Sequence, residues 1–94
     1  MLDELLILKK IKEGEIKAFE ELFRRYYFPL CCYAAGITGQ MAVAEEIVEE
    51  LFYVLWKERE RLQIFQSVKS YLYRATRNQS LQYCEHEEVR NRYR

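Results

Sequence analysis

Residues that make tight turns are scarce in this chain. Its 94 residues include three glycines and one proline, and no stretch alternates apolar and polar residues as a half-buried strand would. Hydrophobic residues make up 50% of the sequence, which is enough for one compact core and leaves no room for a second domain at this length. The sequence therefore predicts an all-α fold, a compact bundle of about four helices.

Apolar residues that recur at helical spacing divide the chain into four segments. The first expected helix lies within residues 3–14, with Asp3 as its N-cap. The second covers residues 16–35, and Pro29 is expected to kink or split it, because proline removes one backbone hydrogen bond. The third covers residues 41–59, and the fourth begins at the N-cap residue Ser67.

The third expected helix carries an acidic face, with no basic residue in residues 41–56. Its glutamates are Glu45, Glu46, Glu49 and Glu50. At about 100° per residue they spread over the side opposite the apolar half, with Tyr53 in the middle of the arc and Trp56 at its edge. The face is either a solvated surface or half of an interface with a basic protein. Unpaired carboxylates four residues apart repel one another, and together with the tyrosine they favour the interface.

The next stretch, residues 61–84, has the opposite charge and contains no acidic residue. Its cations are Arg61, Lys69, Arg74 and Arg77. Phosphates attract cations and unstacked bases stack on aromatic rings, so this composition suits single-stranded nucleic acid. Tyr71 and Tyr83 are expected to be ordinary core aromatics, whereas Tyr73 is expected on the outer face. Phe65, in an expected loop, either tucks under the domain or flanks an extruded base.

A helical wheel separates the fourth expected helix into two faces. The narrow inner face is predicted to hold Val68, Leu72, Ala75, Thr76, Gln79 and Tyr83. The outer face is predicted to hold Lys69, Ser70, Tyr73, Arg74, Arg77 and Ser80. The basic residues of this helix are therefore expected to point away from the core.

The composition also excludes several classes of protein. No run approaches the roughly 18 apolar residues of a membrane span, and the acidic start does not suit a signal peptide, so we expect a cytoplasmic protein without membrane insertion. His86 is the only histidine and has no ligand partner at metal-binding spacing, so no cofactor is expected. Cys31, Cys32 and Cys84 are expected to be reduced and mostly buried. Carboxylates on a convex helix face lack the cleft that catalysis needs, and the chain is not expected to be an enzyme.

Three runs of residues, in order and at matching spacing, resemble region 2 of bacterial extracytoplasmic-function sigma factors, the domain that binds polymerase and melts promoters. The runs are AFEELFRRYY (18–27), AEEIVEELFYVLW (44–56) and SYLYRATRNQSLQY (70–83). The resemblance extends over about residues 13–83 and implies the same helical fold.

In that family the third helix docks on the coiled coil of the largest clamp subunit of core RNA polymerase, through a pattern like Asp-x-x-Gln-Glu. Glu46, Glu49 and Glu50 stand at these positions, although Glu46 is longer than the usual aspartate and Glu49 brings a charge where glutamine is usual. The candidate residues for binding core polymerase are Glu45, Glu46, Glu49, Glu50 and Tyr53.

The resemblance also assigns the fourth helix and the loop before it to the single-stranded non-template strand of the minus-ten promoter element. It implies that one base is flipped into a pocket near residues 62–67. The candidate DNA-binding residues are Arg61, Phe65, Gln66, Lys69, Tyr73, Arg74 and Arg77. Asn78 matches an asparagine of the family and is expected to brace the local structure.

The predicted function is that of a sigma factor domain that binds core polymerase and recognises and melts the minus-ten element. Residues 1–94 are expected to form one domain, with a core at about 3–84 and a charged tail, 85–94, that would lead to an absent second domain. An anti-sigma factor would be a further partner of such a domain. The alternatives are a helical protein-interaction module that binds no nucleic acid and a reader of double-stranded DNA.

Overall fold

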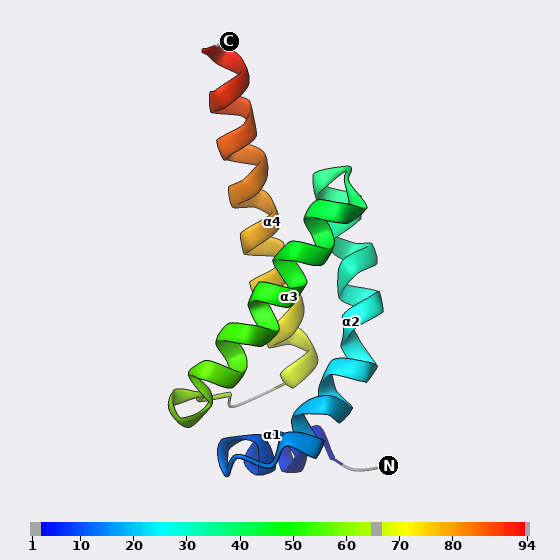
Figure 1. Ribbon diagram of the computed structural model, residues 1–94, viewed down its shortest axis with the longest axis vertical. Helices are drawn as coiled ribbons and strands as arrows, with labels where there is room; N and C mark the ends of the chain where they lie inside the picture. Colours follow the sequence, from blue (N-terminus) through cyan, green and yellow to red (C-terminus); the bar gives the residue numbers. More distant parts are fainter. Residues whose placement is uncertain (1–2, 65–66, 94) are drawn as a thin grey trace.

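The computed structural model describes residues 3–64 and 67–93, and over these residues its regular structure is entirely helical (Figure 1). The α-helices are α1 (Glu4–Lys12), α2 (Ile16–Thr38), α3 (Met41–Lys57) and α4 (Val68–Arg92), and a short 3-10 turn, η1 (Arg59–Arg61), follows α3. Phe65 and Gln66, two of the predicted DNA-binding residues, lie outside the described residues. The prediction of an all-α bundle of about four helices is confirmed.

The three long helices pack on one another, and α1 packs across their lower end (Figure 1). Helix α2 contacts α1, α3 and α4, so it is the central element of the bundle. Every α-helix contributes side chains to one hydrophobic core. The most deeply buried members of that core include Ile7, Ile11, Leu22, Leu30, Val48, Phe52, Val68 and Leu72. These residues recur at helical spacing, as the amphipathic pattern of the sequence predicted.

The helix ends follow local sequence signals. The side chains of Asp3 and Ser67 accept hydrogen bonds from backbone N–H groups two and three residues further on, at 3.2 Å each, so both predicted N-caps are confirmed. Gly14 and Gly39 end α1 and α2 with φ angles of +88° and +75°, which glycine adopts without strain. These signals fix where the chain turns between the packed helices.

Loss of the Ser67 cap is expected to weaken α4 measurably. Ser67→Ala removes the oxygen that accepts the Ser70 N–H bond and should lower the free energy of unfolding by about 1 kcal/mol. Urea denaturation followed by circular dichroism measures this change. Ser67→Asp keeps an acceptor at the same position and should retain most of the stability, so equal losses in the two variants would contradict the capping role.

Helix α2 is continuous through Pro29, so of the two effects predicted for this proline, a kink or a split, the split does not occur. The turns on both sides of the ring carry buried core residues, Tyr26 before it and Leu30 after it. Their packing holds the helix together although one backbone hydrogen bond is missing. The helix also runs to Thr38, three residues past the predicted end, and Gly39 then ends it.

The inner and outer faces of α4 differ in part from the helical wheel. Tyr73 is half-buried, and its ring packs edge-on against Tyr33 of α2 with 5.1 Å between centroids. Ser80 is fully buried and donates a 2.8 Å hydrogen bond to the carbonyl oxygen of Thr76. Gln79, expected inside, is exposed. Val68, Leu72 and Thr76 are buried as predicted, and because α4 packs against both α2 and α3 the buried sector also takes in Ser80.

The cysteines differ in burial. Cys31 is buried, and Cys84 is half-buried with its thiol donating to the carbonyl oxygen of Ile37 at 3.5 Å. Cys32 is exposed, so the prediction of mostly buried cysteines fails at this position. All three are free thiols.

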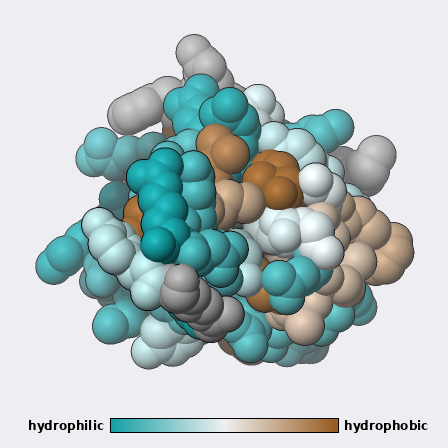
Figure 2. Space-filling view, turned by 90° about the horizontal axis from the view of Figure 1, so that it is seen from above, coloured by the Kyte–Doolittle hydropathy of each residue, from teal (hydrophilic) through white to brown (hydrophobic). Residues whose placement is uncertain are grey.

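The C-terminal part of α4 projects beyond the other helices (Figure 1). The predicted charged tail is helical as far as Arg92, and two ion pairs lie along it, Glu87 with Arg90 at 2.8 Å and Glu88 with Arg92 at 3.0 Å. Seen from this end, hydrophilic residues predominate on the left of the view, and the hydrophobic ones gather mainly in its centre and on its right (Figure 2). Ion pairs between residues three or four positions apart, such as these two, stabilise an exposed helix by a few tenths of a kcal/mol each.

Helix α1 is fastened to α2 by a polar contact. The hydroxyl of Tyr26 donates to the carboxylate of Glu4 at 2.6 Å, and Arg25 lies 3.5 Å from the same carboxylate. Burial and then the Glu4 carboxylate raise the pKa of Tyr26, so its hydroxyl stays protonated as the donor of this bond. The contact fixes α1 beside the segment that leads into α4.

Candidate functional site

The acidic surface, as predicted, lies on α3. It consists of Glu45, Glu46, Glu49, Glu50 and Tyr53, all of them exposed. None of the four carboxylates pairs with a cation among residues 3–64 and 67–93. The ring of Tyr53 is 59% exposed, with the ammonium group of Lys57 5.9 Å from its centroid. The surface therefore offers unneutralised negative charge beside an exposed aromatic ring.

The acidic surface has two edges, which the sequence did not distinguish. Glu45 and Glu49 lie on the side of α2, close enough to act on Tyr27 and Cys31. Burial chiefly, then the Cys31 thiol and these two carboxylates, raise the pKa of Tyr27 to about 12. Glu46 lies on the other edge, which faces α4.

A groove of about 580 Å³ runs between α3 and α4 on that second edge. Its lining residues are Glu46, Ile47, Glu50, Leu51, Val54, Ala75, Asn78, Gln79 and Gln82. The α3 wall therefore combines three aliphatic side chains with two carboxylates, and the α4 wall combines one alanine with three amides. Asn78, expected to brace the local structure, is exposed at this groove. The groove places apolar surface directly beside the acidic surface.

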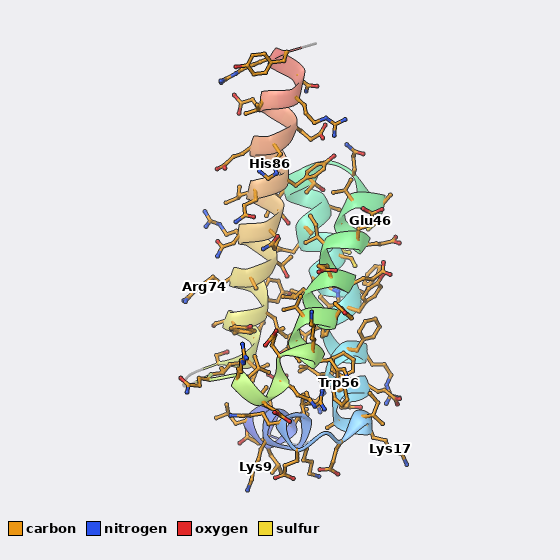
Figure 3. All side chains as sticks on the ribbon, turned by 60° about the vertical axis from the view of Figure 1, so that its left-hand side comes forward. Lys9, Lys17, Glu46, Trp56, Arg74 and His86 are labelled. Carbon is orange, nitrogen blue, oxygen red and sulfur yellow. The ribbon has the colours of Figure 1, made fainter. Side chains whose placement is uncertain are left out.

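The basic face consists of Lys69, Arg74 and Arg77 on α4, and all three are exposed. None of them forms an ion pair with a residue that the structure describes. In Figure 3 Arg74 projects outward from α4 on the left of the bundle, whereas Glu46 lies on α3 at the right. Since Glu46 and Glu50 are not paired with Arg74 or Arg77, the charges of the two surfaces do not cancel.

Two other predicted DNA-binding residues are placed differently. The Arg61 side chain is 86% exposed and lies 3.6 Å from the Glu58 carboxylate, an exposed pair that contributes little and leaves the cation accessible. Tyr73 packs against Tyr33 beneath the basic face, so much of its ring is covered and a full stacking platform is not available there. The four predicted DNA-binding cations are thus all exposed, whereas the predicted DNA-binding tyrosine is half-buried.

A second groove, of about 540 Å³, lies between α1 and the segment after η1. It is lined by Leu5, Leu8, Lys9, Lys12, Glu13, Leu62, Gln63 and Ile64. Lys9 and Lys12 are exposed cations at the edge of the segment where a flipped base is expected. Sequence reasoning missed them, because lysines in the last turn of a helix are already favoured by its dipole and nothing in the pattern links them to residues 62–64.

The described residues offer neither a metal site nor a membrane span. Within them no group of histidine, cysteine, aspartate and glutamate residues could hold a metal ion. No helix in residues 3–64 and 67–93 is long and apolar enough to cross a lipid bilayer.

Comparison with known proteins identifies the family. Residues 22–89 match the family model of sigma-70 region 2. The fold matches the NMR structure of an engineered region 2 of sigmaE in complex with GTAAAA, with a TM-score of 0.79 and 20% sequence identity over 95% of this chain and 93% of that one. A search of curated proteins finds no match. The family match covers most of the helical bundle, including the acidic surface and the basic face, and the chain therefore belongs to the sigma-70 region 2 family.

Proposed function

We propose that this chain is the polymerase-binding and promoter-melting domain of a sigma factor of the extracytoplasmic-function type, acting in the cytoplasm. The observation that carries the proposal is the separation of charge: unpaired carboxylates on α3 and unpaired cations on α4. Opposite charges on separate surfaces allow one small domain to bind a basic protein and a nucleic acid at the same time. The chain contributes binding, and the chemistry of RNA synthesis belongs to the polymerase.

The acidic surface is the proposed docking site for core RNA polymerase. A cationic helix on the coiled coil of the largest clamp subunit would find carboxylates at Glu46 and Glu50 and apolar side chains in the neighbouring groove. Tyr53 would supply buried aromatic area at the centre of such an interface. An anti-sigma factor that covered this surface would block docking.

The basic face is the proposed site for the melted non-template strand. Lys69, Arg74 and Arg77 would neutralise phosphates. The groove lined by Lys9 and Lys12 adjoins residues 62–64, which belong to the segment that would hold a flipped base. Melting then follows from differential binding, because contacts with unpaired bases, worth about 1–3 kcal/mol per stacked base, offset the cost of opening the duplex. The engineered region 2 of sigmaE, which has the same fold, is in complex with GTAAAA, and this supports a nucleic-acid ligand for the present chain.

Fluorescence anisotropy tests the DNA part of this proposal. The chain is titrated into labelled oligonucleotides that differ in a central hexamer, GTAAAA among them, each as a single strand and as a duplex. We expect tighter binding of at least one single strand than of its duplex, and an affinity that falls as salt rises because counterions are released from neutralised phosphates.

Two outcomes of this titration would contradict the proposal. A preference for duplex would indicate a reader of double-stranded DNA. Binding without dependence on salt or strand state would favour a protein-interaction module. Repeating the titration with core polymerase present distinguishes a domain whose affinity for DNA is low only in isolation from a domain that does not bind DNA.

A further inference from the structure

Arg59, in η1, lies at a junction of helices and was not among the predicted functional residues. Its guanidinium carbon is 4.3 Å from the centroid of the Trp56 ring, and its Nη1 donates a 3.0 Å hydrogen bond to the carbonyl oxygen of Trp56. A guanidinium stacked on an indole is a favourable cation–π contact, and its planar shape fits the ring better than an ammonium group does. The side chain is therefore held against the end of α3 instead of extending into solvent.

The Arg59 side chain also lies close to the turn between α1 and α2. A β-carbon at Gly14 would lie 4.0 Å from the Arg59 Nε, and η1 contacts α1. The Nε is buried, with no hydrogen-bond partner among residues 3–64 and 67–93, although the residue as a whole is half-buried. Arg59 thus lies beside both the indole ring and the α1–α2 turn.

This contact connects the segment before α4 to the rest of the bundle. Trp56 packs in turn on Phe19 of α2, with 5.1 Å between centroids. The chain that follows η1 enters the core at Leu62 and packs Ile64 against it. Residues 62–64 then form one wall of the groove whose other wall is α1. Arg59 therefore lies just before the segment that forms one wall of this groove, and its turn contacts the helix that forms the other wall.

We propose that Arg59 is a positioning residue for the single-stranded DNA site. By joining the α1–α2 turn to the end of α3, it holds residues 62–64 in the conformation that shapes the groove beside α1, without contacting a phosphate itself. This inference rests on the proposed function for its effect on DNA binding, whereas its structural part concerns the folded chain alone.

The structural part is tested without DNA, by amide hydrogen exchange and by tryptophan fluorescence. Trp56 is the only tryptophan, so the emission of the chain reports on the surroundings of this one ring. In Arg59→Ala we expect faster exchange at residues 62–64 and a red shift of the emission, because water replaces the guanidinium over the ring. Arg92→Ala, which removes an equal charge from the projecting end of α4, should change neither. Unchanged exchange and emission in Arg59→Ala would overturn the inference.

The effect of Arg59 on DNA binding is tested by anisotropy with the single-stranded oligonucleotide that the unsubstituted chain binds most tightly. Arg59→Ala should weaken binding about fivefold, the size expected for loss of one partly buried cation–π contact, while the salt dependence keeps its slope. A slope lower by about 0.7 would mean that Arg59 neutralises a phosphate directly, and would overturn the positioning role.

Substitution of Arg59 by lysine distinguishes the effect of the planar guanidinium from the effect of its charge. Arg59→Lys keeps the charge but lacks the planar fork, so it should recover less than about half of the lost affinity and should still show the faster exchange. Full recovery by lysine would overturn the inference, because charge alone would then suffice. If the unsubstituted chain binds no single strand even with polymerase present, the proposed function fails, but the exchange and emission results still decide the role of Arg59 in the fold.

Discussion

Charge reversal of the acidic surface, Glu46→Lys with Glu50→Lys, is expected to reduce the affinity for core RNA polymerase by about 100-fold or more. Removing one partner of a close interfacial charge pair costs about 2–5 kcal/mol, and reversal adds repulsion from the same cation. Biolayer interferometry with immobilised core polymerase measures the dissociation constant. Because both side chains are exposed and unpaired with described residues, helicity by circular dichroism should not change.

A matched double reversal controls for net charge. Glu20→Lys with Glu85→Lys changes the charge by the same amount at exposed positions on α2 and on the projecting end of α4. This variant should bind polymerase nearly as well as the unsubstituted chain. An unchanged affinity after reversal of Glu46 and Glu50 would mean that polymerase docks on another surface of the domain.

Removal of two cations from the basic face, Arg74→Ala with Arg77→Ala, is expected to weaken single-stranded DNA binding about tenfold at near-physiological salt. Each neutralised phosphate of a single strand contributes about 0.7 to the slope of log affinity against log salt, so the slope should fall by about 1.4. Anisotropy titrations between about 50 and 200 mM salt measure both quantities. Binding to core polymerase should be retained.

The control for this prediction is Arg90→Ala with Arg92→Ala, which removes the same charge from the far end of α4. These arginines pair with Glu87 and Glu88, so their loss should leave the salt slope unchanged. If the Arg74 and Arg77 substitutions abolished polymerase binding as well, misfolding would be the cause. If the salt slope stayed the same, the phosphates would lie elsewhere.

Sequence alone predicted the helices because their signals are local. The caps at Asp3 and Ser67, the glycine turns and the helical spacing of apolar residues need no knowledge of distant contacts. For Pro29 the sequence left two effects open, a kink or a split. Which one occurs depends on whether Tyr26 and Leu30 are held by other helices, and this is not a local signal.

The sequence predicted the charges of the candidate site but not its shape. Exposed glutamates and arginines could be assigned from helical wheels, because charged side chains stay in water on almost any packing of the bundle. Tyr73 could not, since its exposure depends on Tyr33 from α2. Each groove depends on the relative positions of two elements, and the role proposed for Arg59 depends on the α1–α2 turn that lies beside it.

Site-specific photocrosslinking in one ternary complex of the chain, core polymerase and single-stranded promoter DNA tests the separation of the two surfaces most directly. The photoreactive residue p-benzoylphenylalanine replaces either Tyr53, in the acidic surface, or Arg74, in the basic face; both positions are exposed. We expect position 53 to crosslink to the coiled coil of the largest clamp subunit and position 74 to crosslink to DNA. Crosslinks from position 53 to DNA, or from position 74 to that coiled coil, would contradict this expectation.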